Sequence, residues 1–344
     1  MNLTVVKPGM LTTVQDLGRR GYRAAGVPVS GPMDAYSHRL ANLAVGNVPM
    51  AAALEITILG PELTAEGDLT CAVSGADFEV RVGDAAVRAN EPFAVPSGSR
   101  IRFGARRRGA RATLAVRGGF DMAVTLGSRA THLVSQMGPL GGRALKAGDA
   151  LPVGAEGAEG AEGAEGAEGA RGAGGARGAG GAGSAGGAEG AEGAEGASGA
   201  APIPLELPDG GARVRVLPAV HRERFTGEAW TRLTGERYVV TPQSNRMGYR
   251  LDGPLLAHVG AADILSEAMP VGAIQVPASG QPILLMAECA TTGGYATIGN
   301  VITADLPLAG QLAPGDWIEF VPCTREEALA ALRARERALL GVTA

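Results

Sequence analysis

The chain has 344 residues, a formal net charge of -4 and a hydrophobic fraction of 45%. This length predicts two folded domains, and the weakly negative charge gives no general attraction to nucleic acid or to an anionic membrane surface. No run approaches the roughly 18 apolar residues of a membrane span. We therefore expect a protein that binds neither nucleic acid nor a membrane.

The cysteines and the N-terminus predict the compartment. Cys71, Cys289 and Cys323 show no pair spacing, which argues against a disulfide framework and for a reducing compartment. The N-terminus has no basic region followed by a long apolar core, so it predicts no signal peptide. We therefore expect a cytoplasmic protein.

The lysines and histidines exclude several kinds of site. Lys7 precedes a proline and Lys146 precedes an alanine, so neither of the two lysines completes the Gly-Lys-Ser/Thr of a P-loop. Neither lysine lies between methionines, as the attachment site of a biotin carrier usually does. If ATP or biotin takes part, we expect it to be held by another chain. The four histidines are isolated, so no metal site is predicted.

The first polar loop follows a predicted strand over residues 3–6. Two glycines interrupt residues 11–23 and favour a loop with close backbone approach to a ligand. The side chains in this loop that could orient a ligand are Gln15, Asp16, Arg19 and Arg23. Asp34 then reads as the N-cap of a helix over residues 35–45, with Gly46 as its stop signal.

Residues 53–121 read as short strands separated by turns. The expected strands cover residues 54–58, 70–73, 78–82, 93–95, 100–103 and 112–116. Between them we expect a turn at residues 74–77 and a solvated hairpin tip at residues 106–109. The near-regular spacing predicts an antiparallel meander, and hence a sandwich or barrel. We expect Glu55 to face solvent on its strand, with a role in a site as the alternative.

Glycine recurs at every third position through most of residues 154–199, mainly as Gly-Ala-Glu. A segment whose apolar groups are alanine methyls cannot bury enough surface to fold, so we expect a disordered linker. A collagen-like trimer is the alternative, but the segment lacks the proline that a stable triple helix requires. The expected domains are therefore 1–153, the disordered insert 154–200, and 201–344.

The second half is also predicted to be mainly β, with a few short helices. The expected strands cover residues 213–217, 238–240, 263–267, 272–276, 282–287, 298–302 and 316–321. Thr226 can cap a short helix over residues 227–234. Thr324 and Glu327 form a capping-box pattern before a helix rich in Ala, Leu, Glu and Arg that ends at Leu340.

Residues 241–254 gather polar side chains around a glycine. Arg246 and Arg250 are four positions apart, and on a strand both would lie on the same face. Two planar cations on one face could clamp a carboxylate, a carbamate or a phosphate bidentately. The alternative is a polar turn in which these arginines pair with Asp252 and Glu267.

Six motifs, in order along the chain, resemble those of one family. They lie at residues 8–19, 26–34, 54–57, 244–251, 268–276 and 291–295, the last reading Thr-Thr-Gly-Gly-Tyr. They resemble the biotin-dependent carboxyltransferase domain family, in the branch formed by the C-type subunits of 5-oxoprolinase. Allophanate hydrolase subunit 2 and the carboxyltransferase part of urea carboxylase belong to the same family. The motifs cover both halves of the chain but not the Gly-Ala-Glu insert.

This resemblance implies two β-barrel or sandwich halves of cyclophilin-like character. It also implies an enzyme subunit that is active in a heteromeric complex with a B-type 5-oxoprolinase subunit and a third subunit. That complex would open the lactam of 5-oxoproline to glutamate at the expense of ATP. The alternatives are a biotin-dependent carboxyltransferase of the urea or allophanate pathway, and a regulatory binding protein that antagonises a histidine-kinase inhibitor.

The resemblance also suggests roles for individual residues. Arg246 could bind a carboxylate or an acyl phosphate, Gln275 could read an amide, and Glu267 or Asp16 could move a proton if burial raises its pKa. The residues expected to bind the substrate are Gln15, Arg19, Asn245, Arg250, Thr291, Thr292, Gly293 and Tyr295.

The chain departs from the family pattern beside the last motif. Many relatives carry Gln just before the Thr-Gly-Gly-Tyr run and Pro-Lys just after the tyrosine. Here these places hold Ala290 and the pair Ala296-Thr297. The loss of a carboxamide and an amine bears on the reaction more than on the fold.

Overall fold

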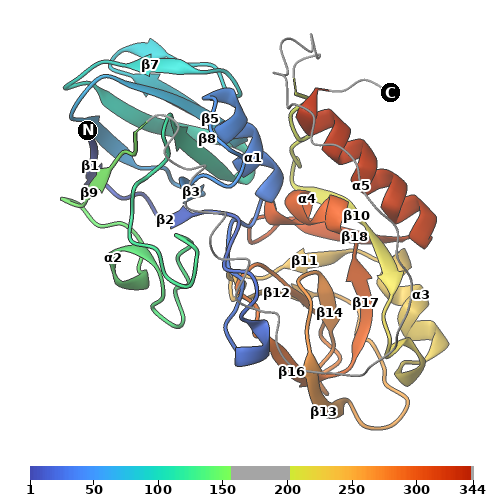
Figure 1. Ribbon diagram of the computed structural model, residues 1–344. Helices are drawn as coiled ribbons and strands as arrows, with labels where there is room; N and C mark the ends of the chain where they lie inside the picture. Colours follow the sequence, from blue (N-terminus) through green and yellow to red (C-terminus); the bar gives the residue numbers. More distant parts are fainter. Residues whose placement is uncertain (156–201, 342–344) are drawn as a thin grey trace, which may run out of the picture.

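The structure of the protein is a computed structural model that describes residues 1–155 and 202–341 (Figure 1). These residues form two halves built mainly of β-strands with a few helices, which confirms the predicted mainly β fold. The expected linker at 154–200 lies almost entirely outside the described residues. Among the described helices, none is both long and apolar enough to cross a membrane.

The N-terminal half is built on a nine-stranded antiparallel sheet. Its main path runs β2-β3-β8-β4-β1-β9, while β5 pairs with β6, β7 and β8. The strands are β1 (Asn2–Lys7), β2 (Leu11–Gln15), β3 (Ala53–Thr57), β4 (Glu62–Ala65), β5 (Leu69–Val82), β6 (Ala85–Ala86), β7 (Phe93–Val95), β8 (Arg100–Val116) and β9 (Ala150–Pro152). The helices are η1 (Arg23–Ala25), α1 (Ala35–Ala44) and α2 (Pro139–Gly142). The path has two ends, at β2 and β9. The N-terminal half, which we expected to be a barrel or a sandwich, is therefore not a closed barrel.

Two long strands replace four of the predicted short ones. β5 runs through residues 74–77 and β8 runs through residues 106–109, so the predicted turn and the predicted hairpin tip are both wrong. The register between β5 and β8 shifts several times along this stretch, as in β-bulges, and Gly75 and Gly109 adopt positive φ there. Glycines that serve bulges inside a strand carry the same sequence signal as glycines in turns.

The predicted helix starts are confirmed by their caps. Asp34 accepts a hydrogen bond from the backbone N–H of Ser37 at 2.8 Å, at the start of α1. Thr226 caps α3 (Gly227–Gly235) in the same way. Thr324 opens α5 (Arg325–Leu340) with a complete capping box. Each cap satisfies backbone donors that would otherwise have no partner in the first turn.

The C-terminal half is a closed barrel with the strand order β10-β17-β14-β15-β12-β11-β18. Its strands are β10 (Gly211–Pro218), β11 (Tyr238–Val240), β12 (Gly248–Asp252), β14 (Ala273–Gln275), β15 (Ile283–Leu285), β17 (Thr297–Val301) and β18 (Trp317–Pro322). Between the first and last strands lie η4 (Arg222–Arg224), η5 (Thr303–Asp305) and α4 (Leu306–Gly310). The parallel pairing of β10 with β18 closes the barrel, which confirms the barrel expected in this half.

A separate two-stranded sheet, here called the outer sheet, accompanies the barrel (Figure 1). It consists of β13 (Asp263–Ala268) and β16 (Thr292–Tyr295), which pair antiparallel. β16 leads directly into the barrel strand β17, and β13 leads into β14 through a short turn. The outer sheet therefore brings two of the sequence motifs next to the barrel wall.

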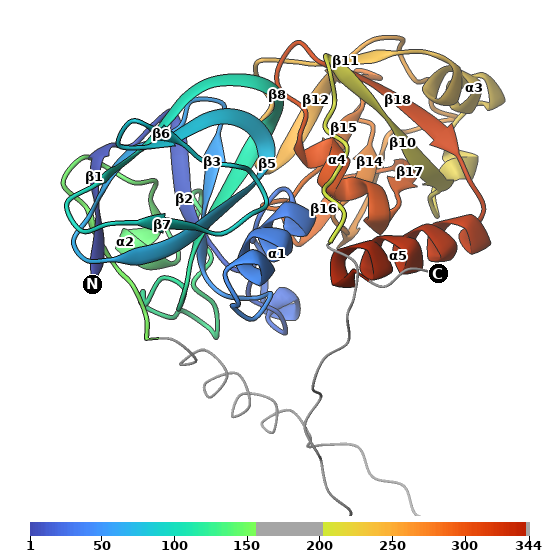
Figure 2. The same ribbon diagram turned by 90° about the horizontal axis from the view of Figure 1, so that it is seen from above.

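A buried glutamine joins the two halves, which lie side by side with α1 between them (Figure 2). The Oε1 atom of Gln311 accepts hydrogen bonds from the backbone N–H groups of Ala110 and Arg111, both at 3.0 Å. Its Nε2 donates to Asp34 Oδ2 at 2.6 Å and to the carbonyl of Arg111 at 2.8 Å. All four hydrogen-bonding positions of this side chain are therefore used, and they fix how the halves meet.

His38 makes the stability of the fold depend on pH. Burial lowers the pKa of this fully buried side chain from 6.5 to about 4, so the folded protein holds it neutral where the unfolded chain takes up a proton. Its stabilising contribution is complete above pH 6.5 and is lost as the pH falls toward 4. We expect this loss to reach about 3 kcal/mol of the free energy of unfolding at pH 4.

The measurement is urea unfolding of the wild type and of His38→Gln between pH 7 and pH 4. Other groups titrate in the same range, so the difference between the two curves isolates His38. We expect the two curves to converge as the pH falls. Parallel curves would show that His38 does not carry the effect.

Candidate functional site

Arg246 links the two halves of the chain. Its Nε donates to Glu288 Oε1 and its Nη2 to the carbonyl of Gly31, both at 2.6 Å, and its Nη1 pairs with Glu55. Burial acts to lower the pKa of Arg246, but the charges of Glu55 and Glu288 outweigh it and hold the pKa above its usual value. Glu55 also accepts the backbone N–H of Met33 at 2.6 Å. The cluster is therefore a buried cation between two carboxylates.

These contacts correct three expectations. Glu55 does not face solvent but is 3% exposed, because its partner comes from the other half of the chain. Arg246 precedes β12 and is buried, whereas Arg250 lies on β12 and is exposed, so they do not share a strand face. The alternative pairing with Asp252 and Glu267 is also wrong, because Arg246 pairs with Glu55 and Glu288.

Two of the predicted site residues shape turns. Asn245 accepts the backbone N–H of Met247 through its Oδ1 at 2.8 Å. Asp16 accepts hydrogen bonds from Gly18 N at 2.8 Å and Ser128 Oγ at 2.6 Å, and also from the backbone N–H of Arg129. Asp16 thus holds two loops of the N-terminal half together, and its role in proton transfer stays a prediction.

A group of buried polar side chains from these loops is incompletely hydrogen bonded. We call Gln15, Arg19, Thr131 and His132 the loop cluster. Gln15 Nε2 donates to the carbonyl of Thr131 at 3.1 Å, and Arg19 Nη2 donates to the carbonyl of Ala130. Within the described residues, four atoms of this cluster have no hydrogen-bond partner, namely Gln15 Oε1, Arg19 Nη1, Thr131 Oγ1 and His132 Nε2. Buried polar atoms are normally paired with protein groups or with water, so these atoms make the loop cluster a candidate for binding a polar ligand or a water molecule.

Electrostatics connects the loop cluster to the buried cation. Burial lowers the pKa of Arg19, and the charges of Asp16 and Glu288 oppose this effect. Burial likewise lowers the pKa of His132, and the charge of Glu288 opposes this shift. Nδ1 of His132 lies 3.2 Å from the backbone N–H of Ser135 and accepts from it, so Nε2 carries the proton in the neutral ring. The sequence pointed to Arg19 but gave no signal for His132, which is an isolated histidine.

Arg23 extends the polar region from the loops to the outer sheet. Its Nη2 donates to the carbonyl of Met269, and the carbonyl of Thr291 is 3.5 Å away. Cys289 lies close by, and burial raises the pKa of its thiol while the charge of Arg23 opposes the shift. An arginine of the N-terminal half thus contacts backbone carbonyls at one end of the outer sheet, just after β13 and just before β16.

The outer sheet brings several predicted residues together. Glu267 on β13 is paired in register with Gly293 on β16. Gln275, on the barrel strand β14, is 7% exposed, and its Nε2 has no hydrogen-bond partner among the residues that the structure describes. A Cβ atom on Gly293 would lie 2.4 Å from that Nε2, so a larger residue there would displace the amide. Thr291 is buried, whereas Thr292 and Tyr295 are exposed.

Two residues that were not predicted as site residues complete this arrangement. His221 Nδ1 lies 3.1 Å from Thr297 Oγ1, and His221 Nε2 lies 3.5 Å from Glu267 Oε1. Thr297 is paired in register with Gln275. We call His221, Glu267, Gln275 and Thr297 the barrel cluster. Thr297 could have been found from the sequence, because it departs from the family pattern. His221 lies 76 residues from Thr297 in the sequence, and no sequence signal pointed to it.

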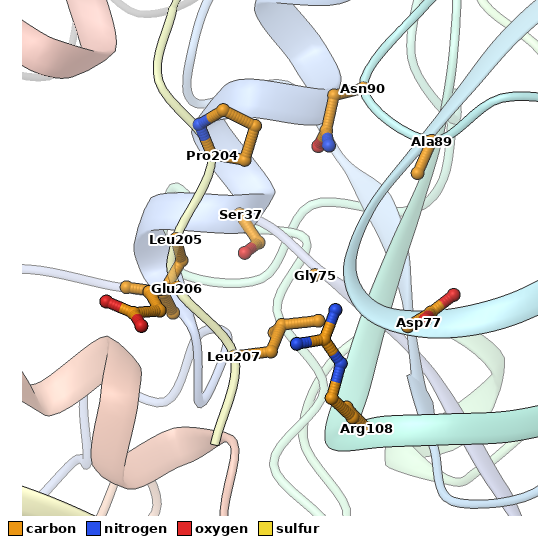
Figure 3. A pocket seen from close by; sticks show the side chains of 10 residues that line it. All are labelled: Ser37, Gly75, Asp77, Ala89, Asn90, Arg108, Pro204, Leu205, Glu206 and Leu207. Carbon is orange, nitrogen blue, oxygen red and sulfur yellow. The ribbon is translucent and has the colours of Figure 1, made fainter. Parts of the chain in front are cut away.

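A cavity of about 310 Å³ lies elsewhere, beside α1, β5 and β8 (Figure 3). Its lining combines apolar side chains from residues 204–207 with the polar side chains of Ser37, Asp77, Asn90, Arg108 and Glu206 (Figure 3). None of the predicted site residues lines it. Within residues 1–155 and 202–341, no group of three or more His, Cys, Asp or Glu side chains is placed to hold a metal ion.

Known proteins resemble this chain over nearly its whole length. A family model described as carboxyltransferase domain, subdomain A and B, matches residues 25–322. The C subunit of the 5-oxoprolinase of Escherichia coli (strain K12) is 35% identical over 335 residues, covering 97% of this chain and 96% of that protein. The urea amidolyase of Lachancea kluyveri is 31% identical over 94% of this chain, which spans 17% of that protein.

The crystal structure of Kluyveromyces lactis urea carboxylase has the same fold. Its TM-score is 0.81 at 29% identity, and the similarity covers 100% of this chain and 30% of that chain. The family match spans the polar loops from η1 onward, the buried Arg246 and the outer sheet. The chain therefore belongs to the family of carboxyltransferase domains with subdomains A and B.

Proposed function

We propose that this chain is the C-type subunit of an ATP-dependent 5-oxoprolinase that opens 5-oxoproline to glutamate. The observation that carries the proposal is the 35% identity with the C subunit of a 5-oxoprolinase, which extends over 97% of this chain and 96% of that protein. The complex would also contain a B-type subunit and a third subunit. Neither lysine of this chain forms a P-loop, so we assign the ATP site to one of these other chains.

The barrel cluster supports this reaction class. A lactam presents a carbonyl oxygen that needs a hydrogen-bond donor, and Gln275 Nε2 is a buried donor without a partner. The ring nitrogen must gain a proton when the ring opens, and His221 and Glu267 lie beside Gln275 and Thr297 as possible proton carriers. We therefore place the lactam against Gln275.

The loop cluster supports a second, anionic ligand group. Within the described residues, Arg19 Nη1 is a donor without a partner and Gln15 Oε1 is an acceptor without a partner. Guanidinium groups bind phosphates and carboxylates through strong charge-assisted hydrogen bonds. An ATP-dependent reaction on an amide provides such a group, and we assign its binding to Arg19.

The test is 5-oxoproline-dependent phosphate release by the three mixed subunits, with each omitted in turn. We expect release to require all three chains. Proline is the matched control, because it has the same ring and carboxylate but no ring carbonyl, and it should give no release above background. Phosphate release that is unchanged when this chain is omitted would contradict the proposal.

Carboxyl transfer is the second candidate, and the similarity to urea amidolyase over 94% of this chain favours it. It requires a biotinylated carrier on another protein, because neither lysine here has the setting of a biotin attachment site. Carboxylation of urea in the presence of such a carrier, without 5-oxoproline-dependent phosphate release, would favour this candidate over the first.

A further inference from the structure

The barrel cluster has the connectivity of a hydroxyl, a base and an orienting carboxylate. Thr297 on β17 contacts His221, which lies just before η4, and His221 contacts Glu267 on β13. The first distance is 3.1 Å, between Thr297 Oγ1 and His221 Nδ1. The second is 3.5 Å, between His221 Nε2 and Glu267 Oε1. A nucleophile within hydrogen-bond reach of a base that a third group orients is the signature of an activated side chain.

The backbone fixes which nitrogen of His221 acts as the base. The N–H of Thr297 also donates to His221 Nδ1, at 3.3 Å. A backbone N–H can only donate, so Nδ1 carries no proton and the neutral ring holds its proton on Nε2, facing Glu267. Nδ1 is thus an acceptor beside the hydroxyl of Thr297, which is the arrangement that proton removal from that hydroxyl requires.

Gln275 supplies the remaining group that acyl transfer needs. It is paired with Thr297 on the neighbouring strand, next to a register shift at Ile274, and both residues adjoin core residues, Ile274 and Ile298, so both side chains project away from the barrel core. Both residues are more than nine-tenths buried, and in the described part of the chain the Nε2 of Gln275 has no hydrogen-bond partner. An unpaired amide donor in a buried setting can stabilise the negative charge that develops on a carbonyl oxygen under attack.

We propose that Thr297 is the nucleophile of this chain and forms a transient ester with the acyl group of its substrate. This deepens the proposed function and rests on it for the identity of the lactam. Oγ of Thr297 bonds to the lactam carbonyl carbon, and its proton passes to His221 Nδ1. The carbon–nitrogen bond then breaks, and the ring nitrogen takes that proton and leaves as an amine.

The second half of the reaction restores the enzyme. A water molecule adds to the ester carbonyl and gives a proton to His221 Nδ1. The bond from the carbonyl carbon to Oγ of Thr297 breaks, and Oγ recovers the proton. The products are the ring-opened amino acid and free Thr297, so the atoms and protons of the two steps balance with one water molecule, and the ATP that the complex consumes takes no part in these bond changes.

The test uses the full chain alone with p-nitrophenyl acetate, a small activated ester that needs no partner protein. We expect intact mass spectrometry to show one added acetyl group and peptide mapping to place it on Thr297. Thr297→Val should lose the adduct, Thr297→Ser should keep it, and His221→Gln should slow its formation by about 10²-fold or more. Thr64→Val, in the N-terminal sheet, is the matched control and should acylate like the wild type.

The outcomes separate this inference from the proposed function. No acetyl adduct on the wild-type chain, or an equal adduct on folded Thr297→Val, would overturn the nucleophile. Circular dichroism melting establishes that each variant is folded. If the assembled complex opens 5-oxoproline equally well with Thr297→Val, the nucleophile is wrong while the proposed function stands. If the adduct forms on Thr297 but the complex has no lactamase activity, the proposed function is wrong while Thr297 remains the nucleophile.

Discussion

Replacing Arg246 with alanine should lower the free energy of unfolding by about 3–5 kcal/mol. The substitution removes the cation between Glu55 and Glu288 and leaves two carboxylates, 3% and 2% exposed, without their counter-charge. Uncompensated buried charge is among the most destabilising changes that one residue can cause. Urea unfolding at neutral pH, followed by circular dichroism, measures the loss.

Arg250→Ala is the matched control, because Arg250 is an exposed arginine on the adjoining strand. We expect it to change stability by no more than about 0.5 kcal/mol. Adding Glu55→Gln to Arg246→Ala should recover part of the loss, because it removes one of the two stranded charges. Equal, small effects of Arg246→Ala and Arg250→Ala would show that the buried ion pairs do not hold the halves together.

Gln275→Leu should lower the activity of the assembled complex by about 10²–10³-fold without destabilising the fold. The Nε2 of Gln275 is buried without a partner, so replacement by an apolar side chain of similar size removes an unsatisfied donor. Thermal unfolding should therefore show an unchanged or raised melting temperature. Activity should fall because the substitution removes the donor that we place at the lactam carbonyl.

Gln243→Leu provides the control for the second experiment, because Gln243 is an exposed glutamine in the loop before Arg246. It should leave both the activity and the melting temperature close to those of the wild type. A Gln275→Leu complex with full activity would remove Gln275 from the reaction. A folded variant of much lower stability would instead indicate a structural role for the amide.

The parts of the fold that depend on residues close together in the sequence could be predicted from the sequence. Asp34, Thr226 and Thr324 cap helices through contacts three residues away, and all three were identified from local pattern alone. The turns predicted inside β5 and β8 failed, because bulges use glycine as turns do. Local sequence cannot distinguish them, since the partner strand decides whether the chain continues.

The candidate site likewise depends on contacts between residues far apart in the sequence, which a local pattern does not predict. The sequence singled out Gln15, Arg19, Glu267 and Gln275 as candidate site residues, but not which of them share a cluster. The pair of Glu55 and Arg246 spans 191 positions, so the alternation of β3 wrongly predicted a solvent-facing glutamate. Burial and partners of charged groups are properties of the assembled halves and leave no trace in a local pattern.

The parallel pairing of β10 with β18 has a consequence for synthesis of the chain. Each residue of β10 that joins this ladder pairs with one about a hundred positions later, as Arg213 and Glu319 do at a separation of 106. Such long-range closure is intrinsically slow, and until β18 has left the ribosome both β10 and β11 carry an open edge. A nascent or truncated chain that lacks β18 should therefore be prone to aggregation and depend on chaperones.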